Sequence, residues 1–230
     1  MNRWREIWRK REAPGEATDL ESLIHLDGFD NGAGKADAEA WTRFGRELAR
    51  RLGMQPADSV FEVGCGSGAL LYLFHAAGHR VGGADFSPRL AEVARRAMPG
   101  VDIAVCEACD VAGPAHDFVL ANSVFSYFPD HDYARRVLAR MLAMAHKGVA
   151  ILDVPDLDRR EDSEAARRAA LPPGEYERRY AGLEHLHYER AWFARETPAG
   201  WGVRVENQWL ENYGNAPYRF NVLIGAERPG

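Results

Sequence analysis

The stretch VFEVGCGSG, residues 60–68, decides the fold of this chain. A short apolar run typical of a β-strand leads into a turn with glycine at alternate positions, and a leucine-rich, helix-like stretch, residues 69–77, follows. Because glycine has no Cβ, the chain can turn sharply here and a ligand can approach its backbone closely. A strand, a glycine turn and a helix in this order open a nucleotide-binding βαβ unit, in which N–H groups at the start of the helix point at the ligand.

Two acidic residues lie beside this turn in a way that suits a ligand. Glu62 comes two residues before the first glycine, at the end of the strand, where its carboxylate can pair with a cationic group. Asp85 closes the next strand-like run, residues 80–85, and an acid there can accept hydrogen bonds from two ribose hydroxyls. Ser87 and Pro88 then predict a helix start, because serine is a preferred N-cap and proline suits the first helical position.

These residues alone leave the ligand open. Gly64, Gly66 and Ala69 also fit the dinucleotide-binding pattern, and Asp85 lies about where that pattern has its acid. A tight βα turn without any ligand is the remaining interpretation. The rest of the chain is needed to separate these readings.

The order of segments over residues 58–153 resembles the class I S-adenosylmethionine (SAM) dependent methyltransferases. Residues 62–68 look like the first motif of that family, and residues 83–87, GADFS, look like the second, whose aspartate binds the ribose. Residues 106–108, CEA, stand where the family has an acid against the adenine, although aspartate is commoner there than Glu107. Residues 117–124, DFVLANSV, look like its fourth strand and the loop after it. The resemblance implies SAM as cofactor, held by Glu62, Gly64, Cys65, Gly66, Gly68, Asp85, Phe86, Glu107, Ala108, Asn122 and Ser123.

The resemblance also predicts the fold class. We expect an α/β protein with a Rossmann-like, seven-stranded, mostly parallel sheet, an antiparallel C-terminal hairpin and helices on both faces. Residues 203–209 alternate between apolar and polar positions, as one strand of that hairpin, and residues 218–226 return as an apolar strand. Lys147 and Gly148 are expected to turn into a fifth strand over residues 149–153. A dinucleotide dehydrogenase more often carries a second α/β half after residue 150, and too few residues follow for one.

The chain is expected to divide into two parts. Residues 1–55 should form N-terminal helices, and residues 56–230 should form the SAM-binding catalytic domain. The N-terminal helices either pack on the sheet or form a lid over the cofactor together with the glycine-rich loop at residues 28–34. An insertion at about residues 154–188 is expected to cover the acceptor site, and its charged part reads as a solvated helix broken by prolines.

Aromatic and titratable residues mark the acceptor side. The loop at residues 125–130 follows the fourth strand, at the edge where open α/β sheets bind ligands. Because π faces stabilise a sulfonium cation, Tyr127 is expected to form a wall for the cofactor, whereas Phe125 and Phe128 favour packing. Within the insertion, one histidine is expected to accept a proton and one tyrosine to place the substrate, and the candidates are His185, His187, Tyr176 and Tyr180.

Composition agrees with one enzyme-sized domain. The chain has 230 residues, 46% of them hydrophobic, which is enough for a substantial core. A net charge of −5 argues against a nucleic-acid partner, and no apolar run approaches the ~18 residues of a membrane span. The N-terminus shows no apolar signal segment, and an odd number of cysteines favours a reducing compartment, so a cytoplasmic protein is expected. One Cys-x-x-Cys, at residues 106–109, is a weak redox or zinc signal, and no metal site is expected.

The sequence therefore predicts a methyltransferase that moves the SAM methyl group to an oxygen, nitrogen or carboxylate acceptor on a small molecule. A base helps a hydroxyl or an amine, and a carboxylate needs none. Two alternatives have the same cofactor motifs: an enzyme that transforms SAM itself by cyclisation or elimination, and a SAM-binding regulatory protein without turnover. The sequence leaves the acceptor and the oligomeric state, monomer or homodimer, undecided.

Overall fold

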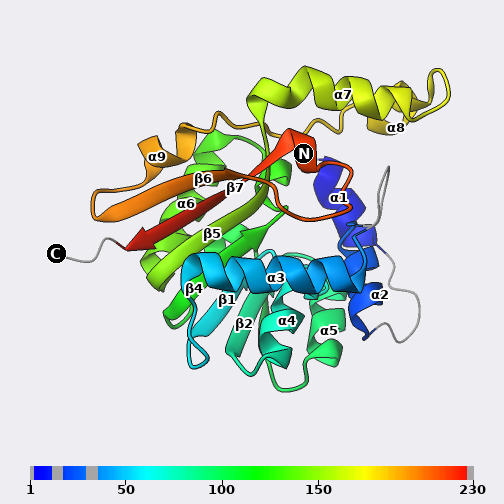
Figure 1. Cartoon of the computed structure of the whole chain (residues 1–230). Coiled ribbons are helices and arrows are strands. Elements are labelled where there is room, and N and C mark those ends of the chain that lie inside the picture. Colours follow the sequence, from blue (N-terminus) through cyan, green and yellow to red (C-terminus); the bar gives the residue numbers. More distant parts are fainter. Residues whose placement is uncertain (1–2, 12–17, 30–35, 227–230) are drawn as a thin grey trace.

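The structure is a computed structural model, and it describes residues 3–11, 18–29 and 36–226. Its centre is a seven-stranded sheet in the order β3-β2-β1-β4-β5-β7-β6 (Figure 1). Strand β7 runs antiparallel to both its neighbours, whereas β1 to β5 pair in parallel. The strands are β1 Ser59–Val63, β2 Arg80–Asp85, β3 Asp102–Val105, β4 His116–Asn122, β5 Ala145–Pro155, β6 Trp201–Asn207 and β7 Arg219–Ala226. The predicted fold class is confirmed.

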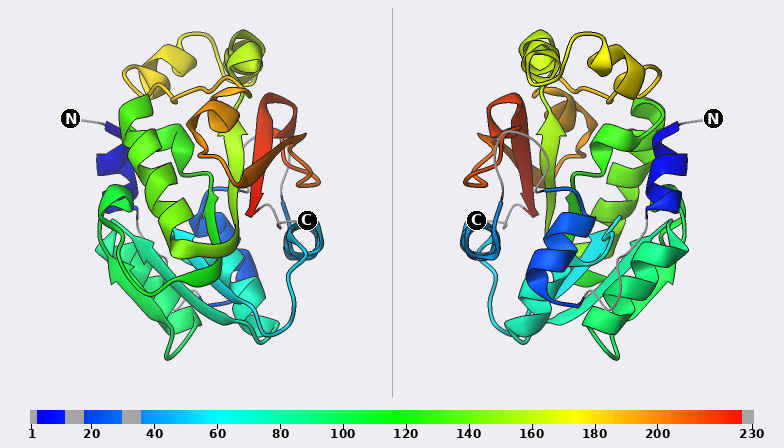
Figure 2. Two further views of the ribbon diagram at one scale, coloured as in Figure 1. Left: turned by 90° about the vertical axis from the view of Figure 1, so that its left-hand side faces the viewer. Right: turned by 90° about the vertical axis from the view of Figure 1, so that its right-hand side faces the viewer.

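Helices cover both faces of this sheet (Figure 2). The α-helices are α1 Arg3–Lys10, α2 Leu20–Leu26, α3 Ala38–Leu52, α4 Ala69–Ala76, α5 Pro88–Ala97, α6 His131–Met144, α7 Arg160–Ala169, α8 Glu175–Tyr180 and α9 Trp192–Glu196. Four short 3₁₀ turns join them: η1 Ala108–Asp110, η2 Phe125–Tyr127, η3 Leu157–Arg159 and η4 Ala216–Tyr218. Helix α5 starts as predicted, with Ser87 as N-cap before Pro88, and Asp19 caps α2 by accepting a hydrogen bond from Ser22 N.

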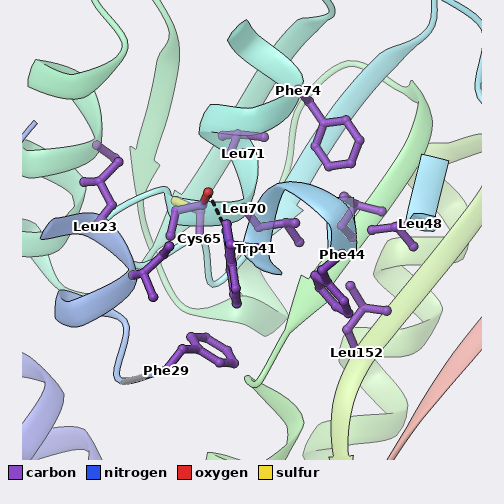
Figure 3. Packing of buried hydrophobic residues seen from close by; sticks show 14 of the residues in the cluster. Leu23, Phe29, Trp41, Phe44, Leu48, Cys65, Leu70, Leu71, Phe74 and Leu152 are labelled. Atoms are coloured by element: carbon purple, nitrogen blue, oxygen red, sulfur yellow. Dashed lines mark hydrogen bonds between the residues drawn. The ribbon is translucent and has the colours of Figure 1, made fainter. Parts of the chain in front are cut away.

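The strands bury side chains on both faces, and successive residues enter two different cores. Phe118 and Leu120 of β4 pack with α2 to α5, and the intervening Val119 packs with α6 and α9. This alternation is the two-residue period of a strand covered on both sides. Trp41 of α3 lies at the centre of the first core, where its Nε1–H donates to Ala69 O at 2.9 Å (Figure 3).

Two expectations about the C-terminal half need correction. The predicted turn at Lys147 and Gly148 is absent, because β5 begins at Ala145 directly after α6. Both residues belong to the strand: Lys147 forms ion pairs with Asp58 and Asp117, and a Cβ on Gly148 would lie 3.0 Å from Ile224 O of β7. Helix α9 was also not predicted from the sequence.

The insertion follows β5 and leaves the sheet. Helices α7 and α8 lie beyond the end of β5, at the top of Figure 1. As predicted, α7 is a charged, exposed helix with local ion pairs such as Arg160–Glu164. The chain then returns to the sheet edge, where Tyr188 N donates to Pro155 O at 2.9 Å. The insertion is therefore anchored at the carboxyl end of β5.

Candidate functional site

The glycine turn joins β1 to α4 and is folded against the end of β2. Gly64 N and Cys65 N donate to Ala84 O, at 2.7 and 3.0 Å. Gly64, Gly66 and Gly68 have φ angles of +69°, +57° and +90°, which L side chains rarely adopt. The sharp turn expected from the sequence is therefore present, and its glycines have left-handed backbone angles.

The carboxylate of Asp27 lies over this turn. It follows α2, and it accepts hydrogen bonds from Ser67 N at 2.8 Å and Ala69 N at 3.2 Å. A Cβ on Gly66 would lie 2.4 Å from Asp27 Oδ1, so this glycine permits the close approach. Asp27 thus satisfies N–H groups at the start of α4, whose N-cap, Gly68, has no side chain to do so. Burial of its carboxylate raises the pKa of Asp27 to about 7.

Asp85 supports the turn from the other side. It ends β2, and its two oxygens accept hydrogen bonds from Gly66 N at 2.9 Å and Ser87 N at 2.7 Å. Burial raises the pKa of Asp85 to about 6 against these hydrogen bonds, which lower it. Each carboxylate oxygen has a second lone pair, so Asp85 can still accept hydrogen bonds from a ligand.

Glu62 has the least satisfied carboxylate of the three. The residue is 2% exposed, and Oε2 has no hydrogen-bond partner among the residues that the structure describes. Burial, followed by the nearby charges of Asp27 and Asp85, raises the pKa of Glu62 well above its usual range. Three acids therefore converge on one point, and such a point favours a ligand with positive charge and hydrogen-bond donors.

A cavity of about 280 Å³ opens at this point. The sequence-predicted cofactor residues that line it are Glu62, Gly64, Cys65, Gly66, Asp85, Phe86, Glu107, Ala108, Asn122, Ser123 and Tyr127. Gly68 does not line it, because the space for a Cβ there faces Met98, the C-cap of α5, 2.7 Å from its Cε. Sequence reasoning missed other lining residues, notably Arg5, Asp27, Phe29, Leu90 and Tyr133.

Three polar atoms around the cavity are buried without a partner within the described ranges. They are the acceptors Glu62 Oε2 and Asn122 Oδ1 and the donor Trp8 Nε1. Buried polar groups are ordinarily hydrogen-bonded, and leaving one unsatisfied is costly. A ligand with both donors and acceptors would satisfy them.

Helix α1 connects this cavity with the insertion. Arg5 forms an ion pair with Glu107, and Trp8 packs on Tyr127 with ring centroids 5.3 Å apart. At the same time Trp4 Nε1–H donates to Glu184 O of the insertion at 3.0 Å. No residue of α1 is buried, so the helix is held by hydrogen bonds, ion pairs and ring contacts at its surface. The predicted glycine-rich loop falls largely at residues 30–34, outside the described residues.

The aromatic loop after β4 divides between core and cavity. Tyr127 lines the cavity and meets the rings of Trp4 and Trp8. Phe125 and Phe128 are 1% and 8% exposed and pack in the second core, as expected, although Phe128 also reaches the cavity.

The four predicted acceptor residues do not line this cavity. His185 stacks on Trp4 at 4.8 Å between ring centroids and meets the ring of Tyr127 at 5.5 Å. His187 Nδ1–H donates to His185 O at 2.9 Å, and this ring lines a separate hollow with Trp192. The other two candidates, Tyr176 and Tyr180, both belong to α8, and their rings pack against each other.

The hydrogen bonds of the two histidines define their protonation. Because an arginine can only donate, His185 Nδ1 accepts from Arg167 Nη1, at 3.3 Å, and Nε2 carries the proton. Burial, with the charges of Arg219 and Arg167, holds the pKa of His185 well below its usual range. Burial lowers the pKa of His187 to about 4. Both rings are therefore neutral at neutral pH.

Neither a metal centre nor a membrane span emerges from the described residues. Among them, no group of three or more histidine, cysteine, aspartate or glutamate side chains could hold a metal ion. No helix within the same ranges is long and apolar enough to cross a membrane.

Comparison with known proteins agrees with this geometry. The family model of a methyltransferase domain matches residues 60–148. Trans-aconitate 2-methyltransferase of Azoarcus sp. (strain BH72) is 32% identical over 153 residues, which make up 65% of this chain and 58% of that protein. The chain thus spans little more than half the length of this relative.

Two solved structures share the fold. Magnesium protoporphyrin IX methyltransferase from Synechocystis PCC 6803, with bound SAM, has a TM-score of 0.59 and 14% identity, over 97% of this chain and 91% of its own. The SAM-bound amino pentose methyltransferase from Micromonospora echinaspora has a TM-score of 0.62 and 16% identity, over 81% of this chain and 92% of its own. At these identities the likeness concerns the fold alone.

Proposed function

We propose that this chain, which belongs to the class I SAM-dependent methyltransferases, transfers the methyl group of SAM to an oxygen, nitrogen or carboxylate of a small molecule. The observation that carries the proposal is the buried carboxylate of Glu62, which has an unpartnered oxygen in the cavity beside the glycine turn. SAM has an ammonium group and a sulfonium, so it offers the positive charge and the donors that this point lacks. When bound, SAM supplies a methyl group that its sulfonium activates for transfer.

The cavity residues fit the parts of this cofactor. We assign the ammonium group to Glu62 and the ribose hydroxyls to Asp85, whose oxygens keep a lone pair each. The adenine is assigned to the side of the cavity formed by Phe86, Glu107 and Ala108. The remaining wall faces the sulfonium and consists of Asn122, Ser123 and Tyr127.

We further propose that residues 1–55 supply a lid and residues 56–230 the catalytic domain. Helix α1 supports this assignment, because it provides Arg5 and Trp8 to the cavity wall and has no buried residue of its own. Such a helix can move without exposing a core side chain of its own. Closed, it excludes water from the site.

The insertion at residues 154–188 is proposed to cover the acceptor. Base catalysis by His185 or His187, and substrate placement by Tyr176 or Tyr180, stay predictions. The Nδ1 lone pair of His185 is occupied by Arg167, and the lowered pKa values of both histidines make them weak bases. These features favour an acceptor that needs no base, such as a carboxylate.

A product analysis tests the proposal. The protein is incubated with methyl-labelled SAM and a metabolite extract, and S-adenosylhomocysteine (SAH) together with a labelled product is expected. Methylthioadenosine instead would indicate chemistry on SAM itself, and SAM binding without any product would indicate a regulatory protein. Calorimetry that detects tight NAD binding and no SAM binding would refute the cofactor assignment. The oligomeric state, monomer or homodimer, and a cytoplasmic location stay predictions.

A further inference from the structure

A buried arginine lies at the same edge of the sheet as the cofactor cavity. Arg219 is the first residue of β7 and pairs with Pro155, the last residue of β5. Because β7 runs antiparallel to β5, the start of β7 lies at the carboxyl ends of the parallel strands, where ligands bind in open α/β sheets. Arg219 is only 8% exposed.

The guanidinium of Arg219 is poorly satisfied. Its nearest acid is Asp153, whose Oδ1 lies 4.0 Å from Arg219 Nε, at the outer limit of an ion pair. Nη1 is buried and finds no hydrogen-bond partner in the part of the chain that the structure describes. Arginine keeps its charge in proteins, and a buried charge without a full partner is costly. An anion beside Nη1 would satisfy this donor and balance the charge.

Asp153 supplies little of what is missing, because it lies 4.0 Å from Arg219 Nε and its oxygens also accept other hydrogen bonds. Oδ2 accepts hydrogen bonds from Ser123 Oγ at 2.8 Å and Tyr213 OH at 3.0 Å. Oδ1 accepts from Gln208 Nε2 at 3.4 Å. The carboxylate is thus held by three neutral donors rather than by the guanidinium.

The backbone at this point is strained in a way that is typical of functional sites. Ser123, just after β4, and Asp153, near the end of β5, have φ angles of +57° and +59°. Such angles are uncommon for residues other than glycine and persist where the surrounding structure enforces them. Ser123 also lines the cofactor cavity, so the pair links that cavity to Arg219.

The surroundings of Arg219 on the insertion side are neutral or positive. The charge of Arg219 helps to lower the pKa of both His185 and His187, after the larger effect of burial on each. Arg167 donates to His185, and Tyr127 and Tyr213 complete the neighbourhood as neutral rings. Asp153 is the acid whose charge acts on Arg219.

We propose that Arg219 binds a carboxylate of the acceptor, so that this enzyme is specific for small molecules that carry one. This inference rests on the proposed methyltransferase function. The planar fork of an arginine matches the two oxygens of a carboxylate and offers nothing comparable to an amine or a neutral hydroxyl. Helix α1 covers the region through Trp4 on His185, and none of its residues is buried.

Binding measurements test this without turnover. The protein is saturated with SAH and titrated calorimetrically, at constant ionic strength, with succinate, trans-aconitate and benzoate, and with succinamide, trans-aconitamide and benzamide. At least one of the carboxylates is expected to bind and its amide is not. Arg219→Met should weaken the carboxylate by about tenfold to a hundredfold, the usual range for a hydrogen bond to a charged group. SAH affinity should stay within about twofold of the wild-type value.

Two further variants separate recognition from folding. Arg219→Lys keeps the charge but not the fork, and it should retain a weakened preference for the carboxylate over the amide. Arg190→Met is the matched control, because Arg190 already pairs with Asp156 at 2.8 Å. This variant should leave the carboxylate affinity unchanged.

Three results would overturn the inference while leaving the proposed function intact. These are SAH binding without binding of any tested carboxylate, equal affinity for a carboxylate and its amide, and unaltered carboxylate affinity in Arg219→Met. Failure of the wild-type protein to bind SAH and SAM would overturn the proposed function, and this inference with it.

Discussion

Replacing Glu62 by glutamine should stabilise the ligand-free protein and weaken its binding of SAM. Glu62 is 2% exposed with an unpartnered Oε2, and burial with Asp27 and Asp85 raises its pKa well above the usual value of 4.5. The folded chain therefore keeps a proton at pH values where the unfolded chain has lost it. The free energy of unfolding of the wild type consequently falls as pH rises above about 4.5. Glutamine has the same shape and no charge, so the variant should escape this loss.

The effect on affinity has the opposite sign. A hydrogen bond between charged groups contributes roughly 1.5–3 kcal/mol, and each 1.4 kcal/mol is about tenfold in affinity. Glutamine can accept one hydrogen bond from the ammonium group but supplies no charge. The affinity for SAM should therefore fall by about tenfold to a hundredfold.

Both effects can be measured on the same preparation. Urea unfolding of the free protein at several pH values between 5 and 8 gives the stability, and calorimetric titration at pH 8 gives the SAM affinity. Glu92→Gln on α5 serves as the control, because that side chain is 57% exposed and should change neither quantity. A Glu62→Gln protein that is less stable at pH 8 and binds SAM normally would refute the reasoning, since the carboxylate would then be structural.

Three further predictions concern the turn, its acid and the lid. Gly66→Ala should cost about 1–3 kcal/mol of unfolding free energy and abolish tight SAM binding, whereas Gly78→Ala, at a φ of +88° with open space around it, should affect stability alone; equal SAM affinities would contradict this. Asp27 has a pKa of about 7 against 3.8 in the unfolded chain, so its contribution to stability falls as pH rises from about 4 to 7, and Asp27→Asn should flatten that part of the unfolding profile. Arg5→Ala should speed SAM dissociation in stopped-flow measurements with little loss of stability, while Arg43→Ala, which breaks an ion pair of similar exposure on α3, should leave the rate unchanged.

The cofactor side of the site was predictable because its residues lie at the ends of strands that the sequence pattern reveals. Glu62, Asp85 and Ser123 each come at or just after the end of a predicted parallel strand. Parallel strands bring their carboxyl ends to one edge, so strand prediction alone places these side chains together. The glycine pattern predicted the turn between β1 and α4, because glycine adopts left-handed φ angles more readily than other residues.

Residues from distant segments could not be placed in this way. Asp27 comes from the end of α2, and the pattern of a helix shows which face is buried but not what it is buried against. The one local signal was an acid at a helix C-terminus, where the helix dipole disfavours it. Arg219 stands at the start of an apolar strand, and its meeting with Asp153 depends on the antiparallel pairing of β7 with β5. Such contacts are fixed by the sheet order, which the sequence does not spell out.

The charges at the carboxyl edge are divided in a manner that fits a cationic cofactor and an anionic acceptor. Asp27, Glu62 and Asp85 gather at the cofactor cavity, and burial raises the pKa of each. Arg219, beyond Ser123 and Asp153, is a cation without a full partner. In the free protein the three acids keep their protons to a higher pH than usual, whereas Arg219 stays charged without a full partner. A bound cation would favour the ionised acids, and a bound anion would compensate Arg219. Because a buried, uncompensated charge is costly, the ligand-free site should be the least stable part of the domain, and binding should stabilise it locally.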